Sequence, residues 1–81
     1  METGYVLLNL NPRMKKPFLQ EIKQVKGVKE AWLVIGIFDA IVMIQAKTVK
    51  ELEEIYFNKI DKLSGIANSR LHFVACPRTR K

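Results

Sequence analysis

The chain has 81 residues, of which 48% are hydrophobic and 27% charged, and its formal net charge at pH 7 is +6. This length suits a single domain, and so apolar a composition excludes an intrinsically disordered chain. The longest uncharged apolar run, residues 31–38, is far shorter than the roughly 20 residues that a membrane-spanning helix needs.

The start of the chain has no cationic segment ahead of an apolar stretch, so no secretory signal is expected. The single cysteine, Cys76, has no partner for an intrachain disulfide, which suits a reducing compartment. We therefore expect a soluble, cytoplasmic protein without membrane contact. Residues 1–76 are expected to form one domain, and residues 77–81 a basic tail.

The first predicted strand covers residues 4–10, a run rich in β-prone residues. A helix is predicted for residues 17–26, where apolar residues recur at the spacing of one helical stripe. Pro17 suits a first helical turn, where its missing N–H costs nothing, although Asn11-Pro12 equally allows an earlier start. Gly27 is the expected left-handed residue after the helix.

Two further strands are predicted for residues 28–35 and 39–46, joined by a short turn around Gly36 into an antiparallel hairpin. Thr48 begins a capping box that opens the second helix, because a glutamate follows three residues later. A Ser-Gly pair ends that helix, and a last strand covers residues 66–76. The buried stripe of this helix is predicted to be Leu52, Ile55, Tyr56, Ile60 and Leu63.

The predicted order is therefore β-α-β-β-α-β, in which each half is a strand–helix–strand unit. This is the pattern of the ferredoxin-like fold of the α+β class. Right-handed crossovers place both helices on one face of a four-stranded antiparallel sheet.

The strands of this sheet are apolar on both sides, although the helices cover only one. An antiparallel sheet with one wet face normally alternates apolar with polar residues. The uncovered face would exceed the few hundred Å² of apolar surface that a soluble monomer exposes. We expect a second copy of the chain to cover it, since two-fold dimers are the commonest oligomers. The residues expected in this dimer interface are Tyr5, Leu7, Trp32, Val34, Val42, Ile44 and His72.

The positive charge invites a nucleic-acid interpretation. Three of the six excess charges belong to Arg78, Arg80 and Lys81 at the end of the chain, and the other lysines are spread among glutamates. This distribution indicates a solvated surface rather than a DNA-reading element. Direct nucleic-acid binding is therefore kept only as an alternative.

The sequence shows no constellation typical of catalysis. His72 and Cys76, four residues apart on one strand, would lie roughly 13 Å apart, too far to bind one metal ion. The glycines are isolated, which excludes a P-loop or a dinucleotide fingerprint. We predict no catalytic residue, no metal site and no cofactor. A cofactor-free enzyme of the dimeric ferredoxin-like class is the alternative, with polar candidates His72, Tyr5, Tyr56 and Trp32.

Asp39 stands out because it follows the hairpin turn and opens an otherwise apolar strand. One interpretation is turn chemistry, in which its carboxylate accepts hydrogen bonds from local backbone N–H groups. The other is that it holds the ammonium group of a small ligand, whose carboxylate meets free backbone amides near Gly36.

Residues 28–44, with the sequence VKEAWLVIGIFDAIVMI, resemble the G-V-x-x-[AC]-x-x-[VL]-x-G-x-[YF]-D-x-x-[VL] core of the effector-binding domain of Lrp/AsnC-type transcriptional regulators. That domain is also called the RAM domain, for regulation of amino-acid metabolism. The resemblance extends over about residues 3–75. Full-length regulators carry a DNA-binding domain ahead of it, so this chain resembles the stand-alone form.

The resemblance implies sheet-to-sheet dimers that assemble into rings, commonly octamers, and amino-acid effectors bound where dimers meet. The matching positions of the effector pocket are Gly36, Ile37, Phe38 and Asp39 in the hairpin loop and Ser69 in the last strand. The family commonly has a second Thr or Ser two residues later, where this chain has Leu71. Arg70 offers a carboxylate partner, or is an exposed strand cation.

These observations together predict a non-enzymatic module that binds an amino acid and oligomerises in transcription regulation. Its expected partners are copies of itself, the effector and full-length Lrp/AsnC regulators whose activity it tunes.

Overall fold

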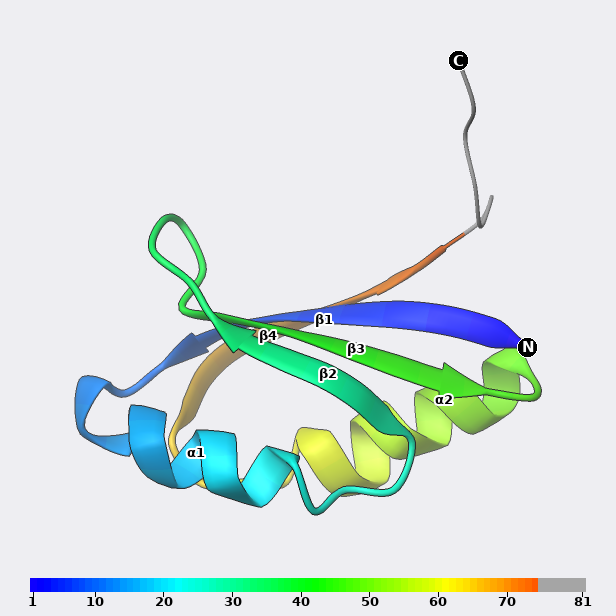
Figure 1. Ribbon diagram of the computed structural model, residues 1–81, viewed down its shortest axis with the longest axis horizontal. Coiled ribbons are helices and arrows are strands. Elements are labelled where there is room, and N and C mark those ends of the chain that lie inside the picture. The colour runs from blue at the N-terminus through cyan, green and yellow to red at the C-terminus, as the bar shows by residue number, and fades with distance from the viewer. Residues whose placement is uncertain (75–81) are drawn as a thin grey trace.

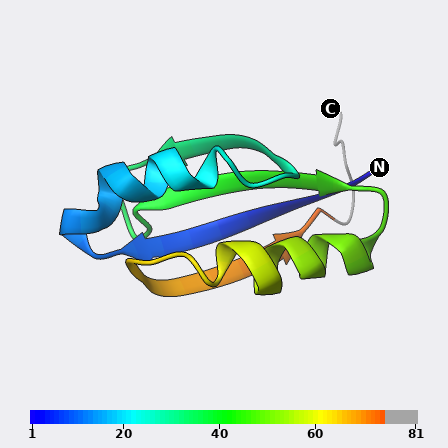
Figure 2. The same cartoon turned by 90° about the horizontal axis from the view of Figure 1, so that it is seen from below.

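The computed structural model describes residues 1–74, which form a four-stranded antiparallel sheet with two helices on one face (Figure 1). The strands lie in the order β2-β3-β1-β4. Seen from the helical side, α1 lies nearer β2 and α2 nearer β4 (Figure 2). The predicted βαββαβ ferredoxin-like fold is thus confirmed. The elements are β1 (Glu2–Leu10), η1 (Pro12–Met14), α1 (Lys15–Ile22), β2 (Val28–Leu33), β3 (Ala40–Ala46), α2 (Val49–Ile55), η2 (Tyr56–Ile60) and β4 (Ile66–Phe73).

The first helical segment begins and ends earlier than predicted. Asn11 caps it, because the Asn11 side-chain oxygen accepts a hydrogen bond from the Arg13 N–H at 3.1 Å, and Pro12 occupies the first position. Helix α1 ends at Ile22, and turn hydrogen bonds carry the chain on to β2. The Asn-Pro pair therefore starts the helix, and the prediction of residues 17–26 is wrong at both ends.

The second helix begins as predicted. Thr48 is its N-cap, and its hydroxyl oxygen accepts a hydrogen bond from the Glu51 N–H at 3.1 Å. The last turn widens into a π-helix, η2, in which the Asp61 N–H donates to the Tyr56 carbonyl at 2.8 Å. In the predicted stripe, Leu52, Tyr56 and Ile60 are buried, while Ile55 and Leu63 are partly buried against the same core.

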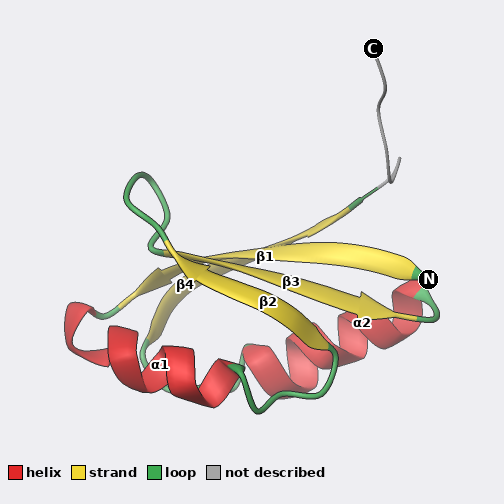
Figure 3. Cartoon of the chain, in the orientation of Figure 1, coloured by secondary structure: helices red, strands yellow, loops and turns green. Residues whose placement is uncertain are grey.

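The hydrophobic core lies between the sheet and the two helices (Figure 3). Its largest fully buried side chains are Phe18, Leu8, Ile22, Ile44, Leu52, Ile60, Val6 and Val42. Strands β2 and β4 are shorter than predicted, since β2 ends where Leu33 pairs with Ala40, and β4 ends at Phe73. Cys76 and the predicted basic tail lie outside the described residues. In residues 1–74 no helix is long and apolar enough to span a membrane.

The pairing register corrects the prediction for β3. Val42 and Ile44 are 0% exposed, because they point into the helix-covered core and cannot lie on the helix-free face. Ile41 and Met43 lie on that face instead, paired with Leu7 and Tyr5 of β1. The sequence could not decide between these two pairs, since both sides of β3 are apolar. Among the other residues predicted for the dimer interface, the register places Tyr5, Leu7, Trp32 and His72 on the helix-free face, and Val34 lies in the connection after β2.

Candidate functional site

The connection between β2 and β3, residues 34–39, rises from the sheet on the side opposite the helices (Figure 1). A hydrogen bond from the Val34 N–H to the Asp39 carbonyl, 2.9 Å long, closes its base. Gly36 has φ = 153°, a backbone angle that side-chain-bearing residues rarely adopt, and lies in open space. Ile35 and Ile37, with relative exposures of 106% and 86%, present an apolar tip to solvent. Such a tip is typical of a contact surface.

The backbone of this connection has free donors. Within the described residues, the N–H groups of residues 35–38 find no acceptor in the chain, whereas the Asp39 N–H donates to the Leu8 carbonyl at 2.8 Å. The Ile37 carbonyl accepts a hydrogen bond from the Asn9 side-chain amide at 2.8 Å, which anchors the loop to β1. Unpaired, exposed N–H groups in succession can bind a carboxylate.

The Asp39 carboxylate has a structural partner, but not a local one. Its Oδ2 accepts a hydrogen bond from the Leu10 N–H at 2.8 Å, across 29 positions of sequence. The main-chain pairing of β1 with β3 stops at Leu8 and Ala40. Beyond that point β3 offers no backbone carbonyl to the Leu10 N–H, and the Asp39 side chain takes the place of that acceptor. The second oxygen, Oδ1, lies 3.8 Å from the Lys15 Nζ. The side chain is 28% exposed, which leaves Oδ1 open to a further partner.

Ser69 lies on the helix-covered side of the sheet, away from the loop. It pairs with Leu8 in the register, and its Oγ is 2.6 Å from the Tyr56 hydroxyl and 3.1 Å from the Asp61 Oδ1. Because the Asp61 carboxylate can only accept, Ser69 donates to it and accepts from Tyr56. These hydrogen bonds connect the π-helical turn to β4. The sequence analysis did not predict them, because no motif in the sequence indicates that these three side chains meet.

Arg70 points to the opposite side from Ser69. It pairs with Leu7 and is exposed on the helix-free face, the same side on which the β2–β3 connection rises. Within one chain, the structure therefore brings Gly36, Ile37, Phe38, Asp39 and Arg70 to one side of the sheet and places Ser69 on the other.

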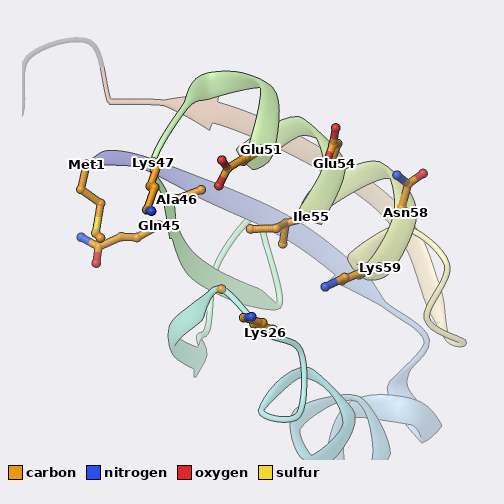
Figure 4. Close-up of a pocket in the computed structure, with 11 residues that line it drawn as sticks. Met1, Lys26, Gln45, Ala46, Lys47, Glu51, Glu54, Ile55, Asn58 and Lys59 are labelled. Carbon is orange, nitrogen blue, oxygen red and sulfur yellow. The ribbon is translucent and has the colours of Figure 1, made fainter.

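A hollow that the sequence did not reveal lies at the other end of β2 and β3 (Figure 4). Its volume is about 530 Å³, within the range of small-molecule clefts. Ile55 points into it from α2. Its rim carries charges of both signs, from Lys26, Lys47, Lys59, Glu51 and Glu54. Among residues 1–74, no group of three or more His, Cys, Asp or Glu side chains is placed to hold a metal ion.

Comparison with known proteins identifies relatives of this architecture. The family model for the Lrp/AsnC ligand binding domain matches residues 3–77, nearly the whole chain. The crystal structure of FFRP-DM1 is 26% identical and superposes with a TM-score of 0.85, covering 91% of this chain and 99% of that one. No curated protein sequence matches.

Two other solved structures show the same fold at lower sequence identity. TTHA0845 from Thermus thermophilus is 22% identical, with a TM-score of 0.90, covering 99% of this chain and all (100%) of that one. The transcriptional regulator NMB0573 from Neisseria meningitidis, solved as a complex with L-Met, is 9% identical with a TM-score of 0.84. That match covers 98% of this chain and 53% of the regulator, so this chain spans about half the regulator's length.

Proposed function

Because this chain belongs to the Lrp/AsnC ligand-binding domain family, we propose that it is a non-enzymatic regulatory module that self-associates and binds an α-amino acid. The match of the family model over residues 3–77 carries the proposal. We further propose that it is a cytoplasmic module that acts on transcription through other subunits, including full-length Lrp/AsnC regulators; its membership of a regulator domain family supports this role.

Self-association is supported by the centre of the helix-free face. Four large apolar side chains, Tyr5, Leu7, Ile41 and Met43, lie there side by side on the two central strands and are only partly buried. Covering them would remove apolar surface from water, which contributes about 25 cal/mol per Å². The exposed isoleucines of the β2–β3 connection offer a second contact, and we propose that dimers join through it into a larger ring, an octamer being the expected size.

Amino-acid binding is supported by complementary charges around the β2–β3 connection. The free N–H groups of residues 35–38 and the Arg70 guanidinium suit a carboxylate, and the Asp39 Oδ1 suits an ammonium group. The complex of NMB0573 with L-Met shows that a regulator with this fold was solved with an amino acid. Since Ser69 lies on the other side of the sheet, we propose that a neighbouring subunit completes the pocket.

Titration calorimetry of the assembled protein with the twenty standard L-amino acids tests this function. We expect at least one amino acid to bind. Asp39→Asn should weaken that binding at least tenfold while keeping the fold, because the asparagine oxygen can still accept the Leu10 N–H. Lys16→Gln, on the exposed side of α1, is the matched control and should bind as the wild type does. Absence of binding to every amino acid, or unchanged affinity in Asp39→Asn, would contradict the proposal.

A further inference from the structure

The hollow at the other end of β2 and β3 from residues 34–39 lies between four segments of the chain (Figure 4). They are the connection between α1 and β2, the end of β3, α2 and η2. The Gly27 carbonyl accepts a hydrogen bond from the Gln45 N–H at 3.0 Å, which ties that connection to β3. Gly27 has φ = 101°, and a Cβ there would come within 2.5 Å of the Ile55 Cδ1, so the connection also packs closely against α2. The walls of the hollow are therefore held in place by contacts between these segments.

Three lysines from separate segments surround this hollow. Lys26 precedes β2, Lys47 follows β3, and Lys59 belongs to η2. In the part of the chain that the structure describes, the single salt bridge joins Lys15 to Asp39, so none of the three lysines has a carboxylate oxygen within 4.0 Å. All three are exposed, so their ammonium groups are accessible to a ligand that enters from solvent.

The carboxylates around the hollow do not balance these lysines. Glu54 is directed outward, whereas Ile55 and Lys59 point toward the middle of the hollow (Figure 4). One carboxylate, that of Glu51, is then left against three ammonium groups, which is an excess of two positive charges. An anion with two negative charges would neutralise this excess.

The phosphate group of a monoester fits these charges. It carries about −1.5 to −2 charges at pH 7, and lysine binds phosphate as a point charge. An amino acid fits less well, because its carboxylate would neutralise only part of the excess and the lysines would repel its ammonium group. The volume of about 530 Å³ leaves space for an organic group beside the phosphate, and the Ile55 side chain offers that group an apolar contact.

We propose that this hollow binds the phosphate group of a small organic phosphate monoester. Nucleoside phosphates and sugar phosphates both present this group, so the recognised chemistry is shared and the organic part distinguishes them. The site does not depend on the proposed amino-acid site, because the two lie at opposite ends of β2 and β3. It would make the module responsive to a second kind of small molecule.

Titrations with AMP, glucose 6-phosphate, inorganic phosphate and adenosine test the proposal, with binding followed by the backbone amide resonances of the isotope-labelled protein. An ionic strength of about 0.1 M limits the contribution of charges more than about 10 Å from the ligand. We expect at least one ester to bind with a Kd of about 1 mM or lower, and to shift the amides of Gly27, Lys47 and Lys59 more than those of residues 34–39. The ester that binds more tightly identifies the organic part. The proposal fails if neither ester binds, if adenosine binds as tightly as AMP, or if inorganic phosphate binds as tightly as both esters.

Two triple variants locate the binding. The first replaces the lysines of the hollow by glutamine: Lys26→Gln, Lys47→Gln and Lys59→Gln. It should weaken ester binding by about tenfold or more, because three attractive charges are lost. The matched control replaces three exposed lysines outside the hollow: Lys16→Gln, Lys50→Gln and Lys62→Gln. It removes the same total charge and should change the Kd by less than about threefold.

Glu51→Gln gives a change in the opposite direction. It removes the carboxylate that opposes the lysines and should tighten ester binding. Circular dichroism verifies that every variant is folded. Equal weakening in the two triple variants would show that the net charge of the protein, and not the hollow, attracts the ester, and would overturn the proposal.

Discussion

Replacing Asp39 by alanine removes the acceptor at the point where the pairing of β1 with β3 stops. The partly buried Leu10 N–H then loses its 2.8 Å hydrogen bond. An unsatisfied donor of this kind costs about 1–3 kcal/mol, because the group gives up water on folding and gains no partner. The contact with Lys15, at 3.8 Å and with the lysine side chain 42% exposed, contributes about 0–1 kcal/mol. The hydrogen bond therefore dominates.

A loss of this size should lower the melting temperature by roughly 4–24 °C, since 1 kcal/mol corresponds to about 4–8 °C in a domain of this length. Thermal unfolding is followed by circular dichroism at one fixed protein concentration, because association would otherwise shift the midpoint. Asp39→Asn should lose only about 1 kcal/mol, since a neutral oxygen still accepts the bond. Amide exchange at Leu10 should accelerate in the alanine variant alone. A wild-type midpoint and wild-type exchange in Asp39→Ala would refute the structural role.

Three other substitutions probe local features. Gly65→Ala should destabilise the domain by about 1–3 kcal/mol in urea unfolding, because φ is +85° there and a Cβ would overlap the Met14 side chain. Gly36→Ala is the control and should cost less, because a Cβ at Gly36 would meet open space. Equal losses in the two variants would contradict the steric argument. Thr48→Ala should cost about 0.5–2 kcal/mol by loss of the N-cap, whereas Thr48→Ser should retain most of it in the same assay. Ser69→Ala should destabilise the fold by about 1–3 kcal/mol through its two lost partners, and a stability equal to wild type would show that this network is dispensable.

The order of strands and helices was predictable because its signals are local. The capping threonine, the glycines between elements and the helical stripe of the second helix all act within a few residues. The first helix was misplaced for a related reason. Two prolines each offered a helical first position, and only the Asn11 cap distinguishes the true start.

The sequence did not show which residues of β3 face the helices and which lie on the helix-free face. Val42 and Ile44 are as apolar as Ile41 and Met43, so hydrophobicity alone carries no preference. The choice is made by pairing with β1, where Val6 and Leu8 lie under the helices and set the register of their neighbours. A one-residue slip would exchange the two sides, so this information exists only in the long-range pairing.

The roles of the polar site residues were hidden for the same reason. The partner of Asp39 lies 29 positions away, and the partners of Ser69 belong to another part of the chain. Both side chains make hydrogen bonds that hold parts of the fold together, and the spacing of residues in the sequence cannot show such bonds. For Asp39 the structural and functional interpretations are compatible. One carboxylate oxygen accepts from the Leu10 N–H, while the other makes only the long 3.8 Å contact with the Lys15 Nζ and belongs to a side chain that is 28% exposed.

The proposed ligand site and the proposed interface share β2, since Trp32 lies on the helix-free face and the loop begins two residues later. If a neighbouring subunit completes the pocket, the ligand binds only the associated form. Linkage then requires that the ligand tighten association by the same factor by which association tightens ligand binding. An amino acid would act on this module by changing how many subunits are joined, and no change of fold within the chain would be needed.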